Sequence, residues 1–239
     1  MGTPHQFGPI TMYFGDASEN ISPTLYENSK DGIAHPLSHP SFACISHIVP
    51  SQYTLFFPHQ VHGTNGIILR DTSLPSFFHD ADFVLTKNNA TAIGIVSADC
   101  VPCIMYDPRA DVIGIAHAGW RGAVFGVVDA MLDATIATFG TCISDIFLWF
   151  GPCAHSCCYQ VDAAFAHNLA DTGKEYALMY KNGQYFFSLI DCITHQCIKR
   201  GIRTDHISSK FSVCTIHTMK YCSYRRQGKA SNRQITIVL

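Results

Sequence analysis

The chain has 239 residues, of which 47% are hydrophobic and 14% are charged, and its net charge is −2. Soluble proteins carry about 25% charged residues, so this chain has no broad field of one sign to attract nucleic acid or an anionic membrane. No apolar run reaches the roughly 18 residues of a membrane helix, and the N-terminal segment lacks the features of a signal peptide. We therefore expect one cytoplasmic domain spanning residues 1–239, with no membrane, nucleic-acid or obligatory protein partner.

The chain contains eleven cysteines, which is an odd and a high number. Without a secretory signal, such cysteines are better interpreted as buried small apolar residues, metal ligands or reactive thiols than as disulfides.

The N-terminal fifty residues are weakly patterned and predict loops with a few short strands. From residue 90 onward the pattern sharpens, with β-type runs at 92–96 and 103–106, a turn at 107–111 and a further run at 112–116. The last three features predict a hairpin whose open end brings the segment 99–103 to His117.

Two cysteines lie at this open end, Cys100 and Cys103. Their odd spacing would point them to opposite faces of a continuous strand, so at most one is a partner for His117. The expected register favours Cys103.

Beyond the hairpin, apolar residues at helical spacing predict an amphipathic helix over 121–139, stopped by Gly140. A strand follows at 145–150, and helices are expected after Tyr159 and near 189–200. A short strand is expected at 235–239. The order of elements indicates an α/β fold with mixed strand pairing.

Three residues with metal-binding side chains lie close to predicted strand ends: His62, Cys100 and His117. A catalytic zinc keeps three protein ligands and leaves the fourth position to water or substrate. Each residue alone is more often a packing residue, but the three together favour a ligand set. His59 is three positions from His62, so in an extended strand only one of them would reach the metal.

Two other cysteine patterns offer alternatives to this zinc site. Cys100 and Cys103 form a C-x-x-C pair, but a redox dithiol needs a helix N-terminus at its first cysteine, and here a β-type run follows. A structural zinc knuckle needs a second C-x-x-C pair, which Cys153, Cys157 and Cys158 do not supply.

Arginines gather near the C-terminus, at 225, 226 and 233, next to tyrosines. Arginine binds phosphate or carboxylate through two parallel hydrogen bonds, although a solvated basic tail has the same composition. Arg121, at the start of the helix that follows His117, is better placed for an anion because the helix N-terminus adds donors.

Several motifs together resemble the laccase-domain (YfiH-type) family. They are His59-Gln-Val-His62-Gly63, Asp80-Ala-Asp82, Ala98-Asp99-Cys100-Val101-Pro102, His117-Ala-Gly-Trp-Arg121-Gly122, Gly151-Pro152 with Cys157-Cys158-Tyr159, and Ser223-Tyr224-Arg225-Arg226. The resemblance implies an α-β-β-α layered sandwich with mixed sheets and duplicated topology. It also implies one metal bound by His62, Cys100 and His117, in place of the Cys103 that register favours.

The family was first described as copper-containing polyphenol oxidases and is now described as zinc-dependent purine nucleoside phosphorylases. The resemblance therefore implies phosphorolysis of adenosine, inosine and 5′-methylthioadenosine to the free base and ribose 1-phosphate, together with deamination of adenosine. Zinc is the expected cofactor and copper the alternative, with nucleoside and phosphate as the small-molecule partners.

For this chemistry the candidate catalytic residues are Arg121, Arg225 and Asp99, and the candidate substrate or phosphate ligands are Arg121, Arg225, Arg226 and His59.

Two departures from the family pattern keep alternatives open. The segment Thr11–Asp16 has Tyr13 where family members have an arginine, and Ser231-Asn232-Arg233 replaces Thr-Gly-Arg. The alternatives are a copper-dependent polyphenol oxidase and a diverged metal-binding protein that turns over no nucleoside.

Overall fold

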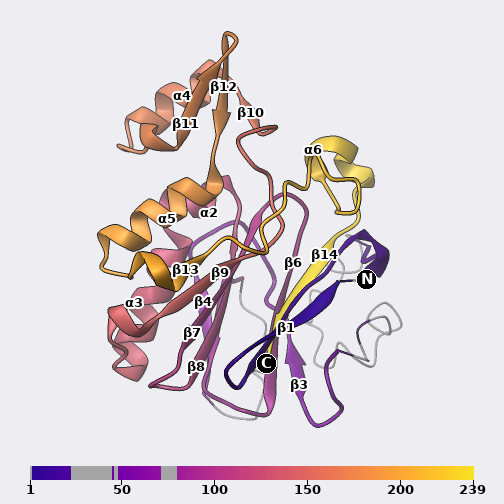
Figure 1. The fold of residues 1–239 in the computed structure, drawn as a ribbon, viewed down its shortest axis with the longest axis vertical. Helices are drawn as coiled ribbons and strands as arrows, with labels where there is room; N and C mark the ends of the chain where they lie inside the picture. The colour runs from indigo at the N-terminus through magenta and orange to yellow at the C-terminus, as the bar shows by residue number, and fades with distance from the viewer. Residues whose placement is uncertain (1, 23–44, 46–47, 71–79) are drawn as a thin grey trace.

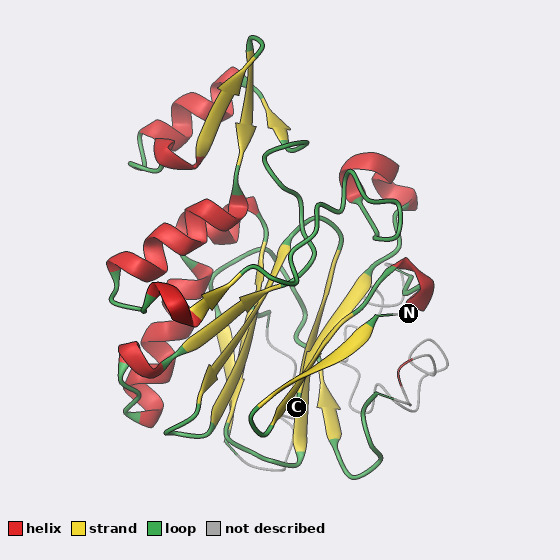
Figure 2. Ribbon diagram, viewed as in Figure 1, coloured by secondary structure: helices red, strands yellow, loops and turns green. Residues whose placement is uncertain are grey.

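Two β-sheets pack face to face, and helices cover the outer face of the larger sheet (Figures 1 and 2). The computed structural model describes residues 2–22, 45, 48–70 and 80–239. The α/β class with mixed sheets, predicted from the order of elements, is confirmed. Part of the segment predicted to be loops with short strands, 23–44 and 46–47, lies outside the described residues.

The larger sheet has six strands in the order β13-β9-β7-β8-β5-β4. Their bounds are β4 Gly66–Leu69, β5 Phe83–Thr86, β7 Val101–Asp107, β8 Val112–Ala118, β9 Phe147–Phe150 and β13 Ile207–Ser208. The predicted hairpin is present as β7 and β8, in which Pro102 lies opposite His117.

The smaller of the two central sheets has five strands in the order β1-β2-β14-β6-β3. Their bounds are β1 Thr3–Phe7, β2 Ile10–Phe14, β3 Thr54–Phe56, β6 Thr91–Ser97 and β14 Gln234–Val238. The predicted C-terminal strand is therefore confirmed, and it lies in the middle of this sheet.

The two sheets repeat the same pattern of pairing. In the five-stranded sheet, the edge strand β3 is parallel to β6, and β14 and then β2 follow in antiparallel pairing. In the six-stranded sheet, the edge strand β4 is parallel to β5, and β8 and then β7 follow in antiparallel pairing. This repetition is the duplicated topology that the family resemblance implies.

Alternation along the strands divides the apolar core into layers, because successive side chains point to opposite faces of a sheet. Ile104, Tyr106 and Ile115 face the space between the sheets, whereas Cys103 and Met105 face the helices. Position 117 has the same parity as Ile115, so His117 belongs to the inter-sheet face at the end of the sandwich.

The predicted helix over 121–139 is two helices, α2 Trp120–Phe125 and α3 Val127–Phe139. The break occurs at Gly126, whose φ of 86° is left-handed and favours glycine. Helix α5, Leu189–Lys199, confirms the helix predicted near 189–200, and α2, α3 and α5 together cover the six-stranded sheet (Figure 1).

A small unit projects from one end of the molecule, at the top of Figure 1. It combines α4, Ala163–Ala170, with a sheet of β10 Gln160–Val161, β12 Gln184–Phe187 and β11 Leu178–Lys181. Phe165 of α4 packs edge-to-face on Trp120, with ring centroids 5.3 Å apart. The remaining short helix, α6, spans Tyr224–Gln227.

Candidate metal centre and its pocket

The β7–β8 hairpin determines which cysteine faces His117. Directly opposed residues of an antiparallel pair share a face, so Pro102 and His117 point the same way. Cys100, two positions before Pro102, also lies on that face, whereas Cys103 points into the core beneath the helices. The preference for Cys103 from register was therefore wrong, and burial raises the pKa of the Cys103 thiol well above its usual value.

The loop that carries His62 is held at two points. The side-chain amide of Gln60 donates to the carbonyl of Val96 (2.8 Å) and accepts from its N–H (2.9 Å), which caps the end of β6. Two residues later, His62 adopts a left-handed backbone with φ of 61°. This turn, rather than strand alternation, separates His62 from His59.

The second anchor of this loop is Asp82, whose fully buried carboxylate also orients His117. One oxygen accepts from the backbone N–H of His62 (3.0 Å) and contacts Nδ1 of His117 (2.9 Å). The other oxygen accepts from the N–H groups of Gly63 (2.5 Å) and Val61 (3.3 Å). With Nδ1 engaged, the Nε2 atom of His117 is left to face Cys100.

The structure brings His62, Cys100 and His117 together, with one ligand atom from each lying within 4.8 Å of the others. The two imidazole rings are nearly perpendicular, with centroids 4.8 Å apart. Gly119 packs closely against this group, because a Cβ there would stand 2.9 Å from the ring of His62 and 3.0 Å from the Cys100 sulfur.

Cys100 and His117 shift each other's pKa in opposite directions. Burial raises the pKa of Cys100, but the charge of His117 and hydrogen bonds from both imidazoles outweigh it and lower that pKa to about 6. Burial lowers the pKa of His117, but the Cys100 thiolate and hydrogen bonds to Asp82 and Cys100 raise it to about 9. Cys100 is thus a thiolate at neutral pH, the form that binds metals.

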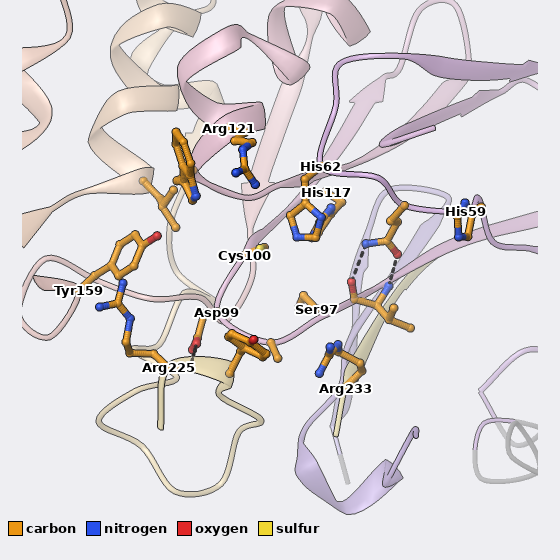
Figure 3. A pocket seen from close by; sticks show the side chains of 16 residues that line it. His59, His62, Ser97, Asp99, Cys100, His117, Arg121, Tyr159, Arg225 and Arg233 are labelled. Carbon is orange, nitrogen blue, oxygen red and sulfur yellow. Dashed lines mark hydrogen bonds between the residues drawn. The ribbon is translucent and has the colours of Figure 1, made fainter. Parts of the chain in front are cut away.

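These residues open into a pocket of about 660 Å³ (Figure 3), within the range of roughly 300–1,000 Å³ that small-molecule sites occupy. Tyr159 and Arg225 lie on one side of Cys100 in Figure 3, Arg121 lies above Cys100, and His59 and Arg233 lie on the other side. The pocket therefore has cationic groups at both ends.

Arg121 and Arg225 are each supported by an aromatic ring. The guanidinium of Arg121 lies 4.7 Å from the ring centroid of Trp120, and that of Arg225 lies 4.8 Å from the ring centroid of Tyr159. Such contacts hold a cation without neutralising it. Burial and the nearby Cys100 raise the pKa of Tyr159 to about 12, so its hydroxyl stays protonated.

Asp99 lines the pocket in a left-handed conformation with φ of 85°. Its carboxylate accepts from the hydroxyl of Thr215 (2.6 Å) and from the backbone N–H of Arg225 (2.6 Å). Asp99 therefore fixes the start of α6, which carries Arg225 into the pocket. His59 also lines the pocket, and its Nδ1 contacts the exposed Asp80 carboxylate at 2.7 Å.

Arg226 is placed differently from the sequence expectation. Its guanidinium donates to the backbone carbonyls of Thr215, Ile216 and Tyr221, and it does not line the pocket. These bonds tie α6 to the preceding loop, so we correct the expectation that Arg226 binds phosphate.

Sequence reasoning missed three residues that shape the site: Gln60, Asp82 and Gly119. Asp82 had a usable signal, since it stands in the Asp80-Ala-Asp82 motif immediately before the apolar run of β5. Arg233 lines the pocket, although the sequence analysis named it only as one of the C-terminal arginines and not as a candidate ligand. Tyr13, at the position of the missing family arginine, is buried on the outer face of the five-stranded sheet and donates to Glu19.

The donor set fits one zinc ion. Two imidazoles and one thiolate leave a fourth position open toward the pocket, which is the pattern of catalytic zinc sites, and Asp82 supplies the carboxylate that usually orients a ligating histidine. Over the described ranges, the convergent metal-competent groups are this one and a cluster of three cysteines. Neither provides the several histidines of a trinuclear copper centre.

Comparison with known proteins assigns the chain to a family. Residues 42–239 match the family model described as multi-copper polyphenol oxidoreductase laccase, so the chain belongs to this family, as its motifs indicated. A purine nucleoside phosphorylase of Aquifex aeolicus is 32% identical over 185 residues, covering 77% of this chain and 82% of the relative. A purine nucleoside phosphorylase of Clostridium acetobutylicum is 28% identical over 163 residues, 67% of each chain.

Among solved structures, the hypothetical protein YfiH of Bacillus licheniformis superimposes with a TM-score of 0.78 at 24% identity, covering 98% of this chain and 93% of the other. At this identity the likeness establishes the fold. Within the part of the chain that the structure describes, no helix has the length and apolar composition of a membrane span.

Proposed function

We propose that this protein is a zinc-dependent purine nucleoside phosphorylase that also deaminates adenosine. The observation that carries the proposal is the convergence of His62, Cys100 and His117 at a pocket that also contains Arg121 and Arg225. The names of the relatives support nucleoside and phosphate as substrates. The donor set supports zinc.

In phosphorolysis, a phosphate oxygen attacks C1′ of the ribose while the bond from C1′ to the purine nitrogen breaks, and the base leaves with the electron pair and takes up a proton. The residues must therefore bind a dianion close to the sugar and stabilise the departing base. Arg121 and Arg225 supply the cationic donors for phosphate, because each is held by an aromatic ring and faces the pocket.

Asp99 acts as a positioning residue in this scheme, since it holds the backbone of Arg225. The protonated hydroxyl of Tyr159 is available to donate to the sugar or the base. His59 and Arg233, at the opposite end of the pocket, are available to bind the other end of the nucleoside. When bound, zinc would supply a Lewis acid that polarises a substrate group or activates water for deamination.

The test is to incubate purified protein with adenosine, with and without phosphate, and to quantify adenine, inosine and ribose 1-phosphate beside the zinc content. We expect phosphate-dependent release of adenine and ribose 1-phosphate, with phosphate-independent formation of inosine. Arg225→Ala should lower phosphorolysis at least tenfold, mainly through a weaker apparent affinity for phosphate. Arg203→Ala is the matched control, because Arg203 is exposed and pairs with Asp205 outside the pocket.

Either of two results would overturn the proposal in favour of another function. Turnover of phenols that requires added copper, without nucleoside turnover, would identify a phenol oxidase. Bound zinc without turnover of either substrate class would identify a diverged metal-binding protein.

A further inference from the structure

Cys157, Cys158 and Cys214 form a second cluster of sulfur ligands, and none of them lines the pocket. One sulfur from each lies within 4.8 Å of the others, and the sulfurs of Cys157 and Cys158 are 3.5 Å apart. The cluster shares no residue with the group of His62, Cys100 and His117.

The chain brings these sulfurs together by two local devices. Adjacent residues in an extended strand point to opposite faces, but residues 156–158 form a turn in which the N–H groups of Cys158 and Tyr159 both donate to the carbonyl of His155 (3.0 and 2.8 Å). This turn places the sulfurs of Cys157 and Cys158 on the same side.

The third sulfur arrives from a segment far along the chain. Cys153 and Cys214 form a parallel bridge, in which Cys153 donates to Val213 (3.1 Å) and Thr215 donates to Cys153 (2.9 Å). This bridge holds Cys214 next to the segment that leads into the turn of residues 156–158.

We propose that Cys157, Cys158 and Cys214 form a second metal site, for a thiophilic cation of which Zn²⁺ is the representative. Thiolates select zinc and other soft cations over hard ones. Zinc–sulfur bonds of about 2.3 Å in tetrahedral geometry place sulfurs about 3.8 Å apart. The sulfurs of Cys157 and Cys158 are already 3.5 Å apart, and all three lie within 4.8 Å of one another. Cys157 is exposed, so the fourth position is open to water.

This site would join two segments that support residues of the pocket. Cys158 precedes Tyr159, against which Arg225 stacks, and Cys214 precedes Thr215, which donates to Asp99. A cation bridging the sulfurs would hold these segments together. Its role is therefore positional, and its detection does not depend on nucleoside turnover.

The first test is metal stoichiometry. The reduced full-length protein is loaded anaerobically with Zn²⁺, freed of excess metal, and analysed for zinc per chain. We expect two zinc ions in the wild type and one in Cys157→Ser, whose exposed position makes the substitution tolerable for folding. Cys142→Ser is the matched control, because Cys142 is also an exposed free cysteine but lies outside the cluster, and it should retain two.

The second test separates the two sites by charge-transfer absorption with Cd²⁺. The cluster offers three sulfurs and the His62 site offers one. Cys100→Ser should therefore keep most of the cadmium–thiolate band, whereas Cys157→Ser combined with Cys158→Ser should lose most of it. A zinc content of the reduced wild type that Cys157→Ser leaves unchanged would overturn the proposal, as would an unchanged cadmium band in the double variant.

Discussion

The substitution Asp82→Asn tests the construction of the metal centre without removing a ligand. The Asp82 carboxylate accepts four hydrogen bonds, one from Nδ1 of His117 and three from the backbone of the loop that carries His62. Asparagine keeps one acceptor oxygen, but its NH₂ group must then face N–H donors. Either the orientation of His117 or the loop conformation loses its support.

The expected magnitude follows from the role of such carboxylates. Removing the group that orients a metal-bound histidine costs about 10–100-fold in metal affinity, equivalent to about 1.4–2.8 kcal/mol. We therefore expect the zinc dissociation constant of Asp82→Asn to rise by this factor. The neighbouring Asp80→Asn is the control, because Asp80 is exposed and contacts His59 rather than the metal ligands.

The assay is competition of the purified, metal-free protein with a chromophoric zinc chelator at fixed pH, with circular dichroism to establish that the variant is folded. A folded Asp82→Asn protein whose zinc affinity stays within threefold of the wild type would refute the reasoning. So would an equal loss of affinity in Asp80→Asn.

Three further predictions concern the same centre. Cys100→Ala should abolish zinc binding at the His62 site and nucleoside turnover, whereas Cys103→Ala should retain both and lose only some thermal stability; equal losses in the two variants would contradict the ligand assignment. Gly119→Ala should weaken zinc binding about tenfold, because the added Cβ would press on His62 and Cys100. An unchanged zinc affinity, measured by chelator competition, would contradict this prediction and show that the backbone shifts to make room for the Cβ. Between about pH 6 and pH 9, zinc binding should release about one proton from the Cys100–His117 pair, because His117 must become neutral while Cys100 is already a thiolate. The number of protons released should fall toward zero above pH 9 and rise below pH 6. Calorimetry in buffers of different ionisation enthalpy measures this number.

The sequence predicted the elements whose signals are local. The apolar runs and the turn at 107–111 predicted the β7–β8 hairpin, including the approach of segment 99–103 to His117. The error at Cys103 has a simple cause: a strand alternates faces at every residue, so a pairing known to within one residue leaves the face undetermined. The motif resemblance chose Cys100, and the observed register explains that choice.

Gly126 marks the limit of periodicity as a signal. The apolar residues from Val124 to Met131 follow helical spacing across it, so the pattern predicts one helix. The left-handed φ of Gly126 divides that helix without disturbing the apolar face of either part. Arg121 is therefore carried by a helix of six residues, and its position in the pocket rests on Trp120 more than on the helix dipole.

Local sequence patterns could not predict the contacts of Asp82, because these contacts depend on how strands distant in the sequence pair. Asp82 reaches His117 because β5 lies beside β8, with Phe83 opposite Ala116. The loop of His62 is bound to the five-stranded sheet through Gln60 and Val96, and to the six-stranded sheet through Asp82. His62 therefore stands where the two sheets are joined, Cys100 lies in the connection from β6 to β7, and His117 lies on β8 of the six-stranded sheet. It follows that a metal held by all three residues would stabilise the packing of one sheet on the other as well as form the reactive centre.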